Sequence, residues 1–436
     1  MAFLFSGRTF LLCAVLSASC SLIAQENRIQ DGQRELAADM LQDVYKDVKS
    51  DYYDPKYHGV DIEARFKQAG ELIKKANSFN QALGAIAWYL DPLNDSHTFF
   101  VPPDRAFHLD YGWRMQMVGD KCLITAVKPG TDAEKQGLKP GDEILTLATV
   151  APERNNLWKL EYLFNTLRPQ PALRLVIQRA GSEQKTMDVQ AEIVRSQQVI
   201  TVDNYWKEIV DYERSLQPYE RRWVSLDNQV LVWKLPDFEM DEKGVDAVIG
   251  RAAGYKALVL DLRGNPGGYI NALRRMVGNV FDHDITIGTM EKRKKSEPMN
   301  SKGNKAFNGK LIVLIDSRSA SSAEIFARVI QLEKRGAVVG DRSAGAVMVA
   351  EERPHEVGLD RRVFYGDSLT IGNVVMADGK SLEHAGVTPD EVLLPTPQDL
   401  AAGRDPVLAR AVSLAGAQIS PEEAGKLFPV KWVKYQ

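Results

Sequence analysis

The spacing of apolar residues divides the chain into regions of different structure. Over residues 34–92 apolar residues recur at intervals of three and four, which predicts amphipathic helices. Over residues 108–198 short alternating stretches predict strands, and 173–181 followed by 185–194 fits a closing hairpin. A helical N-terminal region followed by a small β domain is therefore expected.

Beyond residue 228 the pattern changes to continuous apolar runs separated by helical periodicity. Such alternation predicts an α/β layer with a mainly parallel sheet. The runs are 229–238, 257–263, 311–316 and 337–341. The aromatic and charged stretch 199–228 is expected to be a linker or a helix between domains, and the chain after Pro395 to be helix and tail.

The N-terminus has the pattern of a secretory signal peptide. Arg8 supplies a positive start, an apolar stretch follows, and small residues precede a cleavage site expected after Ala24. The alternative, a membrane anchor, is disfavoured because the apolar run is too short to span a bilayer. Cys20 raises the question of lipidation, but Ser17 stands where a lipoprotein signal usually has Leu. We expect an exported protein, periplasmic or extracellular, with no lipid anchor and no stable membrane span.

Composition and charge exclude several classes of function. The formal net charge of −3 over 436 residues argues against a nucleic-acid-binding protein. The three cysteines, at 13, 20 and 122, have no metal-ligand spacing, and no phosphate-binding loop is present. We therefore expect neither a metal site nor a cofactor.

The stretch "SRSASSAEIF", residues 317–326, follows a predicted buried strand and begins a predicted helix. Ser321 with Glu324 three residues later fits a capping box, which satisfies the first free N–H groups of a helix. The same position suits a nucleophile, because a serine on a sharp strand-to-helix turn is exposed beside free N–H groups. The stretch alone leaves both roles open.

A second turn, "DLRGNPGG" at 261–268, also follows a predicted strand. With glycine at 267 and 268 the backbone can approach a ligand closely and direct N–H groups at it. Taken alone, it is equally an ordinary strand-to-helix turn.

The β region contains "PGTDAEKQGLKPGDEIL", residues 129–145, which resembles a PDZ domain. That resemblance implies binding of peptide C-termini by strand addition, with the carboxylate held by backbone N–H groups. The loop expected to hold it is Tyr111, Gly112, Trp113 and Arg114. The alternative is a β domain that only packs on its neighbour.

Five motifs occur in one order along the chain, and together they resemble the C-terminal processing and tricorn-type serine peptidases. They are "DSHT" (95–98), "DLRGNPGG", "SASSAE" (319–324), "GDRSAG" (340–345) and "LEHAGVTPD" (382–390). The resemblance implies peptide-bond hydrolysis through an acyl-enzyme on Ser321. It also implies an oxyanion hole built from the backbone of Ser322 and of Gly267 or Gly268.

One position departs from this pattern. The processing-protease branch has a lysine base directly after the "GDRSAG" motif, where this chain has Ala346. The tricorn branch uses a histidine preceded by serine, which implies His97 as general base with Ser96 beside it and Glu383 in support. His384 is a competitor for the base. The remaining histidines match no motif: His58, His108, His283 and His355.

The expected architecture is a multidomain α+β protein with a helical N-terminal region, a PDZ-like β domain and an α/β catalytic core. Its expected segments are 1–24 (signal peptide), 25–107, 108–198, 199–400 and 401–436 (helical tail). The leading interpretation is a secreted serine endopeptidase acting on peptides or unfolded proteins, with C-terminal tails suggested by analogy. An inactive peptide-binding pseudopeptidase and a small-ligand binder on the same fold remain alternatives. The motif "DSHT" favours the enzyme, because an inert core has no need of it.

Overall fold

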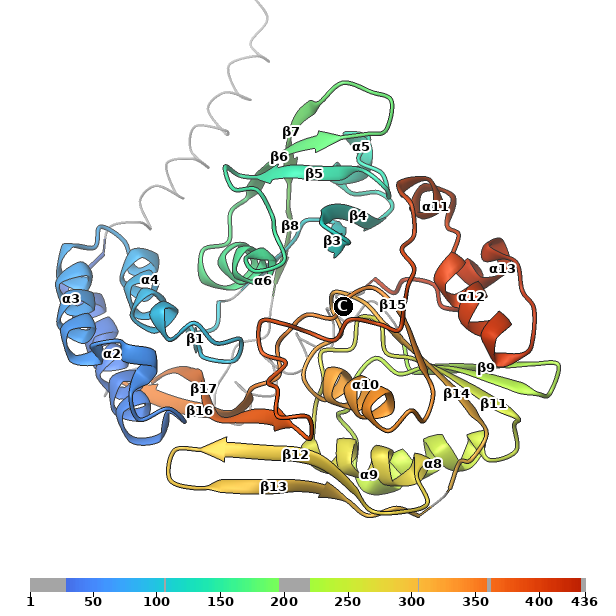
Figure 1. The fold of residues 1–436 in the computed structure, drawn as a ribbon. Coiled ribbons are helices and arrows are strands. Elements are labelled where there is room, and N and C mark those ends of the chain that lie inside the picture. The colour runs from blue at the N-terminus through green and yellow to red at the C-terminus, as the bar shows by residue number, and fades with distance from the viewer. Residues whose placement is uncertain (1–28, 106, 196–219, 305, 359–361, 433–436) are drawn as a thin grey trace, which may run out of the picture.

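The structure of the protein, a computed structural model, describes residues 29–105, 107–195, 220–304, 306–358 and 362–432. The expected signal peptide and most of the expected linker lie outside these ranges. Figure 1 shows the described parts, with N-terminal helices at one side, a small sheet above and a larger α/β layer below. In these ranges no helix has both the length and the apolar character needed to cross a bilayer.

Three helices form the N-terminal region and confirm the helical periodicity: α2 (Asp31–Asp51), α3 (Ile62–Lys75) and α4 (Phe79–Leu90). Side chains of Asp61 and Ser78 cap the last two by accepting backbone N–H groups. The buried faces of the helices pack together and against a long strand of the core. Two 3₁₀ turns follow α2 and α4: η1 (Tyr57–Gly59) and η2 (Asp91–Leu93).

The middle of the chain forms a five-stranded antiparallel sheet around its own apolar core. The predicted hairpin is confirmed, since β6 pairs with β7. The sheet order is β3 (Trp113–Val118), β4 (Lys121–Val127), β5 (Glu143–Leu147), β6 (Ala172–Gln178) and β7 (Lys185–Gln190). Three short helical segments accompany it: α5 (Asp132–Lys135), α6 (Leu157–Glu161) and η3 (Tyr162–Leu167). A two-stranded sheet of β2 (Phe107–Asp110) and β8 (Glu192–Arg195) lies at its base.

The four predicted apolar runs form neighbouring strands of one six-stranded sheet, all parallel to one another. The sheet order is β18 (Glu391–Val392), β15 (Ala337–Gly340), β14 (Lys310–Ile315), β11 (Ala257–Asp261), β10 (Val230–Lys234) and β9 (Arg222–Leu226). Only β9 runs antiparallel to its neighbour. Successive side chains of the central strands enter two different apolar cores, which explains why these strands are apolar throughout.

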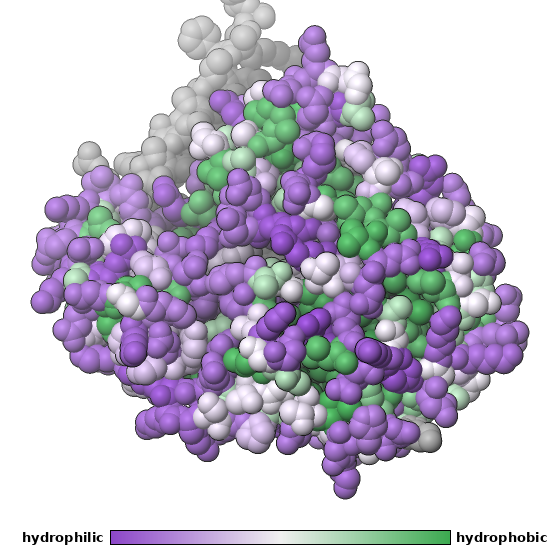
Figure 2. All heavy atoms as spheres, in the orientation of Figure 1, coloured by the Kyte–Doolittle hydropathy of each residue, from purple (hydrophilic) through white to green (hydrophobic). Residues whose placement is uncertain are grey.

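Helices cover both faces of this sheet (Figure 1). One face packs against α8 (Glu242–Ala252), α9 (Ile270–Val280) and α10 (Ser322–Leu332). The other face packs against the C-terminal helices α12 (Pro406–Ala415) and α13 (Pro421–Leu427), which follow α11 (Pro397–Ala402). In the view of Figure 2 the rim of the molecule is mostly hydrophilic, and apolar patches gather nearer the middle and around the C-terminal helices.

A second antiparallel sheet was not expected from the sequence. It contains β1 (Phe99–Val101), β12 (Ile285–Lys292), β13 (Ser296–Ser301), β16 (Val349–Val357) and β17 (Val363–Met376). Strand β16 reads "VAEERPHEV" and is half exposed, so it carries no apolar run that would have marked it. The sheet extends from the core to helix α2, with which β17 shares an apolar cluster (Figure 1).

Candidate active site

Ser321 occupies the turn between β14 and α10, as the sequence predicted. Its backbone φ is +51°, a conformation that residues other than glycine rarely adopt and that clusters at functional turns. Glu324 Oε2 accepts the Ser321 N–H at 3.2 Å, which is one half of a capping box, but the Ser321 hydroxyl makes no capping hydrogen bond. The hydroxyl is thus not committed to the helix, which is the condition a nucleophile requires.

The neighbouring serines have structural contacts. Ser319 is buried, and its hydroxyl donates to the carbonyl of Leu262 at 2.8 Å and accepts the N–H of Asp316 at 2.9 Å. The Ser322 hydroxyl donates to the carbonyl of Gly268 at 3.0 Å. Of the three serines, Ser321 alone has no hydroxyl hydrogen bond in the described part of the chain.

The glycine turn after β11 lies directly against Ser321. A Cβ atom at Gly267 would come within 2.6 Å of Ser321 Cβ and 3.0 Å of the Ser322 nitrogen, so only glycine fits there. The Gly267 N–H is committed, because it donates to Asn265 Oδ1 at 2.8 Å. Within the described residues, the N–H groups of Gly268 and Ser322 have no hydrogen-bond partner.

His97 is held in a tight turn by a buried aspartate. Asp95 Oδ1 accepts the N–H groups of His97 at 3.0 Å and Thr98 at 2.7 Å. The same carboxylate accepts the hydroxyls of Thr370 on β17 at 2.6 Å and of Tyr52 after α2 at 2.7 Å. Asp95 is the first residue of "DSHT", yet sequence reasoning assigned it no role. The structure identifies it as the anchor of the turn.

A chain of hydrogen bonds connects Glu383, Ser96 and His97. The Ser96 hydroxyl lies 3.0 Å from Glu383 Oε2 and 2.7 Å from His97 Nδ1, and the Ser96 N–H donates to Glu383 Oε1 at 2.8 Å. Burial lowers the pKa of the His97 imidazole, against the opposing negative charges of Glu383 and Asp95. The imidazole of the half-buried His97 is therefore neutral at pH 7 and able to accept a proton.

One loop joins this chain to the serine turn. The Ser321 N–H donates to the carbonyl of Ala346 at 2.6 Å, and the next residue, Val347, donates its N–H to Glu383 Oε2 at 2.9 Å. The consecutive residues Ala346 and Val347 thus bind the turn that carries Ser321 and the carboxylate of Glu383. No hydrogen bond joins the Ser321 hydroxyl to His97 in the described residues, which is common for catalytic pairs before substrate binds.

Glu324 does more than cap a helix, and the sequence indicated only the capping role. Its buried carboxylate accepts the Ser343 hydroxyl at 2.5 Å and the N–H groups of Gly345 at 2.7 Å, Ala346 at 2.8 Å and Ser321 at 3.2 Å. Burial raises its pKa to about 7, and these hydrogen bonds oppose that rise. Glu324 therefore fastens the loop after β15 to the start of α10.

Replacing Glu324 by Gln should destabilise this junction. A side-chain amide has only one acceptor oxygen, so in either orientation its NH₂ group would face at least one backbone N–H donor and leave it unsatisfied. A buried unsatisfied group costs about 1–3 kcal/mol, so the free energy of unfolding should fall by about that amount. Urea denaturation measures this, with Glu333→Gln at the exposed end of the same helix as control. Equal stability of the two variants would contradict the assignment.

Two other basic side chains are engaged elsewhere. His384 is mostly exposed, and its Nε2 lies 2.9 Å from the carbonyl of Asn94. Lys234 is buried at the end of β10, and burial lowers its pKa. Its amine donates to Asp261 Oδ1 at 3.1 Å and to the carbonyl of Arg263 at 2.6 Å. Among the described residues, no hydrogen bond joins either side chain to the candidate nucleophile.

The loop expected to hold a peptide carboxylate, Tyr111–Arg114, is partly committed within its own domain. Tyr111 is buried, and its hydroxyl donates to the carbonyl of Gln170 at 2.7 Å. The Gly112 N–H donates to Asp110 Oδ1 at 2.9 Å. The Gly112 N–H thus already has a partner, and the role of this loop in holding a peptide carboxylate stays a prediction.

Strand β3, which continues from this loop, is the edge strand of the five-stranded sheet. Its edge contacts the segment that precedes the serine turn. The Arg318 side chain donates to the carbonyl of Met115 at 2.5 Å, and the Ser317 hydroxyl donates to the carbonyl of Met117 at 2.5 Å. The small sheet and the turn that carries Ser321 are thus in direct contact.

Known proteins with similar sequences are serine proteases. A "Probable CtpA-like serine protease" of Staphylococcus aureus (strain MRSA252) is 24% identical over 375 residues, which are 82% of this chain and 65% of that protein. The "Carboxy-terminal processing protease CtpA" of Bacillus subtilis (strain 168) is 22% identical over 394 residues, 87% of this chain and 75% of that protein. The chain thus spans slightly less than two thirds of the length of the first of these relatives.

Solved structures show the same fold. Mature CPAF superposes with a TM-score of 0.63 at 15% identity, covering 85% of this chain and 94% of that one. The photosystem II D1 C-terminal processing protease gives a TM-score of 0.51 at 20% identity, covering 90% of this chain and 100% of that one. Residues 229–393, the α/β layer from β10 to β18, match the model described as Peptidase family S41. This part of the protein therefore resembles peptidase family S41.

Proposed function

We propose that the protein is a serine peptidase in which Ser321 attacks the peptide carbonyl and His97 accepts the serine proton. The observation that supports this most is the hydrogen-bonded chain from Glu383 through Ser96 to His97, fastened to the loop that holds the Ser321 turn. An inert peptide-binding core would have no use for this arrangement. It also supplies a base although the position of the family's lysine is Ala346.

The direction of the hydrogen bonds sets the state of the imidazole. The Ser96 hydroxyl donates its one hydrogen bond to the Glu383 carboxylate, so its oxygen accepts a hydrogen bond from the N–H group of His97 Nδ1. Nε2 is then left with its lone pair and can take the Ser321 proton. The imidazolium formed in that step is stabilised through Ser96 by the Glu383 charge. His97 next protonates the leaving amine, and water hydrolyses the acyl-enzyme by the same route in reverse.

Negative charge on the tetrahedral intermediate requires N–H donors. The Ser322 N–H lies at the N-terminus of α10, where the helix dipole favours an anion. Of the two glycines, Gly268 is the better second donor, because the Gly267 N–H is committed to Asn265. We assign the oxyanion hole to the backbone of Ser322 and Gly268.

A fluorophosphonate probe tests the nucleophile directly, because it forms a covalent bond only with an activated serine. The full chain should gain the mass of one probe, and the labelled peptide should contain Ser321. Folded protein that gains no probe mass would instead favour the pseudopeptidase alternative.

Substrates are proposed to be peptides or unfolded proteins, including C-terminal tails. The Bacillus subtilis relative is described as a carboxy-terminal processing protease, which supports this class. The five-stranded sheet is proposed as a PDZ-like domain that receives the tail along β3. A peptide that pairs with this edge would have to displace the contacts of Ser317 and Arg318. Export rests on residues 1–24 and stays a prediction.

Amidation of a peptide's C-terminus should weaken its binding to the PDZ-like domain. The change removes the negative charge that backbone N–H groups would hold, so affinity should fall more than about tenfold, or about 1.4 kcal/mol. Calorimetry on the full chain, with Ser321→Ala to prevent cleavage, compares the free and amidated forms of one peptide. Equal affinities would mean that the sheet serves packing alone.

A further inference from the structure

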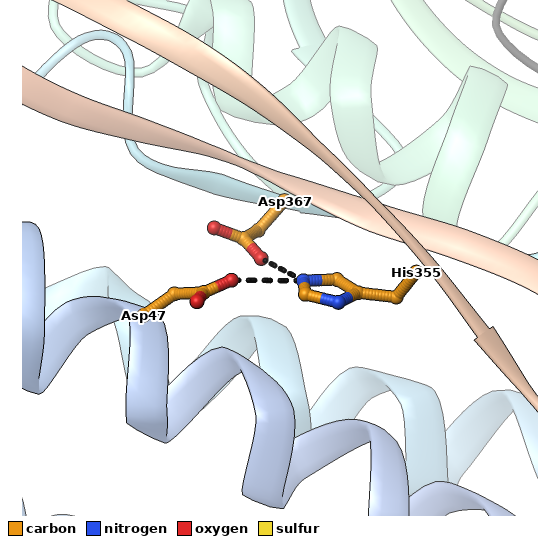
Figure 3. Close-up of side chains that lie close together, drawn as sticks. All are labelled: Asp47, His355 and Asp367. Atoms are coloured by element: carbon orange, nitrogen blue, oxygen red, sulfur yellow. Dashed lines mark hydrogen bonds and ion pairs between the residues drawn. The ribbon is translucent and has the colours of Figure 1, made fainter.

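Three side chains from separate elements converge where the N-terminal helices meet the second sheet. They are Asp47 on α2, His355 on β16 and Asp367 on β17 (Figure 3). His355 Nε2 lies 2.8 Å from Asp47 Oδ2 and 3.1 Å from Asp367 Oδ1. Neither the proposed catalytic chain nor the peptide-binding sheet includes these residues.

The cluster lacks hydrogen-bond donors. A ring nitrogen has at most one proton, and the geometry directs the proton on Nε2 to Asp367 Oδ1. Asp47 Oδ2 lies closer to the nitrogen, yet it is buried and accepts no hydrogen bond. The second oxygen of Asp367, Oδ2, is also buried without a hydrogen-bond partner, and that side chain is only 1% exposed. Two buried carboxylate oxygens of the cluster thus have no donor in the part of the chain that the structure describes.

Negative charge exceeds positive charge around the ring. Arg353 contacts Asp47 Oδ1 at 3.4 Å, but it lies closer to Asp51, at 2.8 Å. A buried carboxylate without full compensation is costly, so a cation that both carboxylates could share would stabilise the cluster.

We propose that Asp47, His355 and Asp367 bind a divalent transition-metal ion of the Zn²⁺ type, which tethers α2 to β16 and β17. One imidazole nitrogen with carboxylate oxygens suits Zn²⁺, whereas Ca²⁺ and Mg²⁺ prefer more ligands, all of them oxygen. Ligand atoms of a tetrahedral zinc site lie about 3.4 Å apart. The present contacts of 2.8 and 3.1 Å would therefore need to open by only about 0.3–0.6 Å.

Access to the cluster is available from the side of Asp47 and His355, which are each 20% exposed. A fourth ligand, water, fits an open position of this kind. The sequence predicted no metal site, because the three ligands are separated by 308 and 12 positions (355 − 47 and 367 − 355) and form no motif.

Calorimetric titration of the full chain with Zn²⁺ tests the site. We expect one zinc per chain, with affinity at least tenfold weaker in Asp367→Asn and in His355→Gln. His283→Gln serves as matched control, because that exposed histidine contacts a single carboxylate, Asp282, and it should bind as the unaltered chain does.

Zinc could instead bind at His97 and Glu383, so a His97→Ala variant separates the two sites. Zinc binding that is lost in His97→Ala but kept in Asp367→Asn would overturn the inference. So would the absence of any binding heat at about 1 mM Zn²⁺, which leaves the cluster as ion pairs only. If His355→Gln does not fold, Asp47→Asn on α2 provides the same comparison of zinc affinity.

Hydrogen exchange adds a readout that depends on the tether. Zinc should slow exchange of the amides in the C-terminal half of α2 in the unaltered chain and leave them unchanged in Asp47→Asn. Equal slowing in both proteins would place the ion elsewhere and overturn the inference.

Discussion

Ser321→Ala should abolish peptide hydrolysis and probe labelling, with a loss in turnover of at least about ten-thousandfold. The substitution removes the atom that would form the acyl-enzyme, and the hydroxyls of the two neighbouring serines are already committed. Ser319 and Ser322 direct theirs to the carbonyls of Leu262 and Gly268. Steady-state hydrolysis of an unfolded protein substrate and fluorophosphonate labelling provide the two measurements.

Stability must be followed in the same experiment. Because the Ser321 hydroxyl makes no capping hydrogen bond, Ser321→Ala should cost less than the usual 1 kcal/mol of a lost cap. Ser319→Ala is the matched control, since it removes a buried hydroxyl with two partners and should lower stability while labelling per folded molecule persists. Full turnover in folded Ser321→Ala would end the peptidase proposal.

His97→Ala should lower the catalytic rate about a thousandfold or more, because a serine hydroxyl without its base is nearly unreactive. The acid limb of the pH–rate profile of the unaltered enzyme is a second test. An ordinary imidazole has a pKa near 6.5, and burial lowers the pKa of His97 below that value. Since the neutral form is the base, activity should persist at pH 6.5 and fall only at more acidic pH.

His384→Ala is the control for this assignment. Its ring is mostly exposed and contacts the carbonyl of Asn94, so the variant should keep most of its turnover. If His384→Ala lost activity while His97→Ala kept it, the base would be His384. If neither variant lost activity and the acid limb lay well above pH 7, a buried amine such as Lys234 would become the candidate.

Local sequence patterns were sufficient to predict the helices that bury one face and the strands that are covered on both faces. The periodicity of residues 34–92 predicted α2, α3 and α4, because each helix buries one face. The apolar runs predicted β10, β11, β14 and β15, because these strands are covered on both faces. The strands β16 and β17 escaped prediction. Strand β16 is half exposed and carries no apolar run, and the sequence pattern shows neither the pairing of the two strands nor their packing against α2.

Local sequence patterns likewise identified only a part of the candidate site. Ser321, the glycine turn, "DSHT" and Glu383 were found from short motifs, and their roles remain predictions. Contacts across the fold decide which hydrogen-bonding groups of the site are free and which already have a partner. Examples are the Gly267 N–H with Asn265 and the Glu324 carboxylate with the loop after β15. No local pattern contains that information.

The sequence by itself determined the helices and strands with clear periodicity, the order of the motifs and the identity of the candidate nucleophile, because these depend on neighbouring residues. Tertiary structure alone decided that Ser96 meets Glu383 from 287 positions away, and that Asp47 meets His355 and Asp367. Such contacts form where packed layers bring distant segments together. Their geometry follows from the packing of the whole chain.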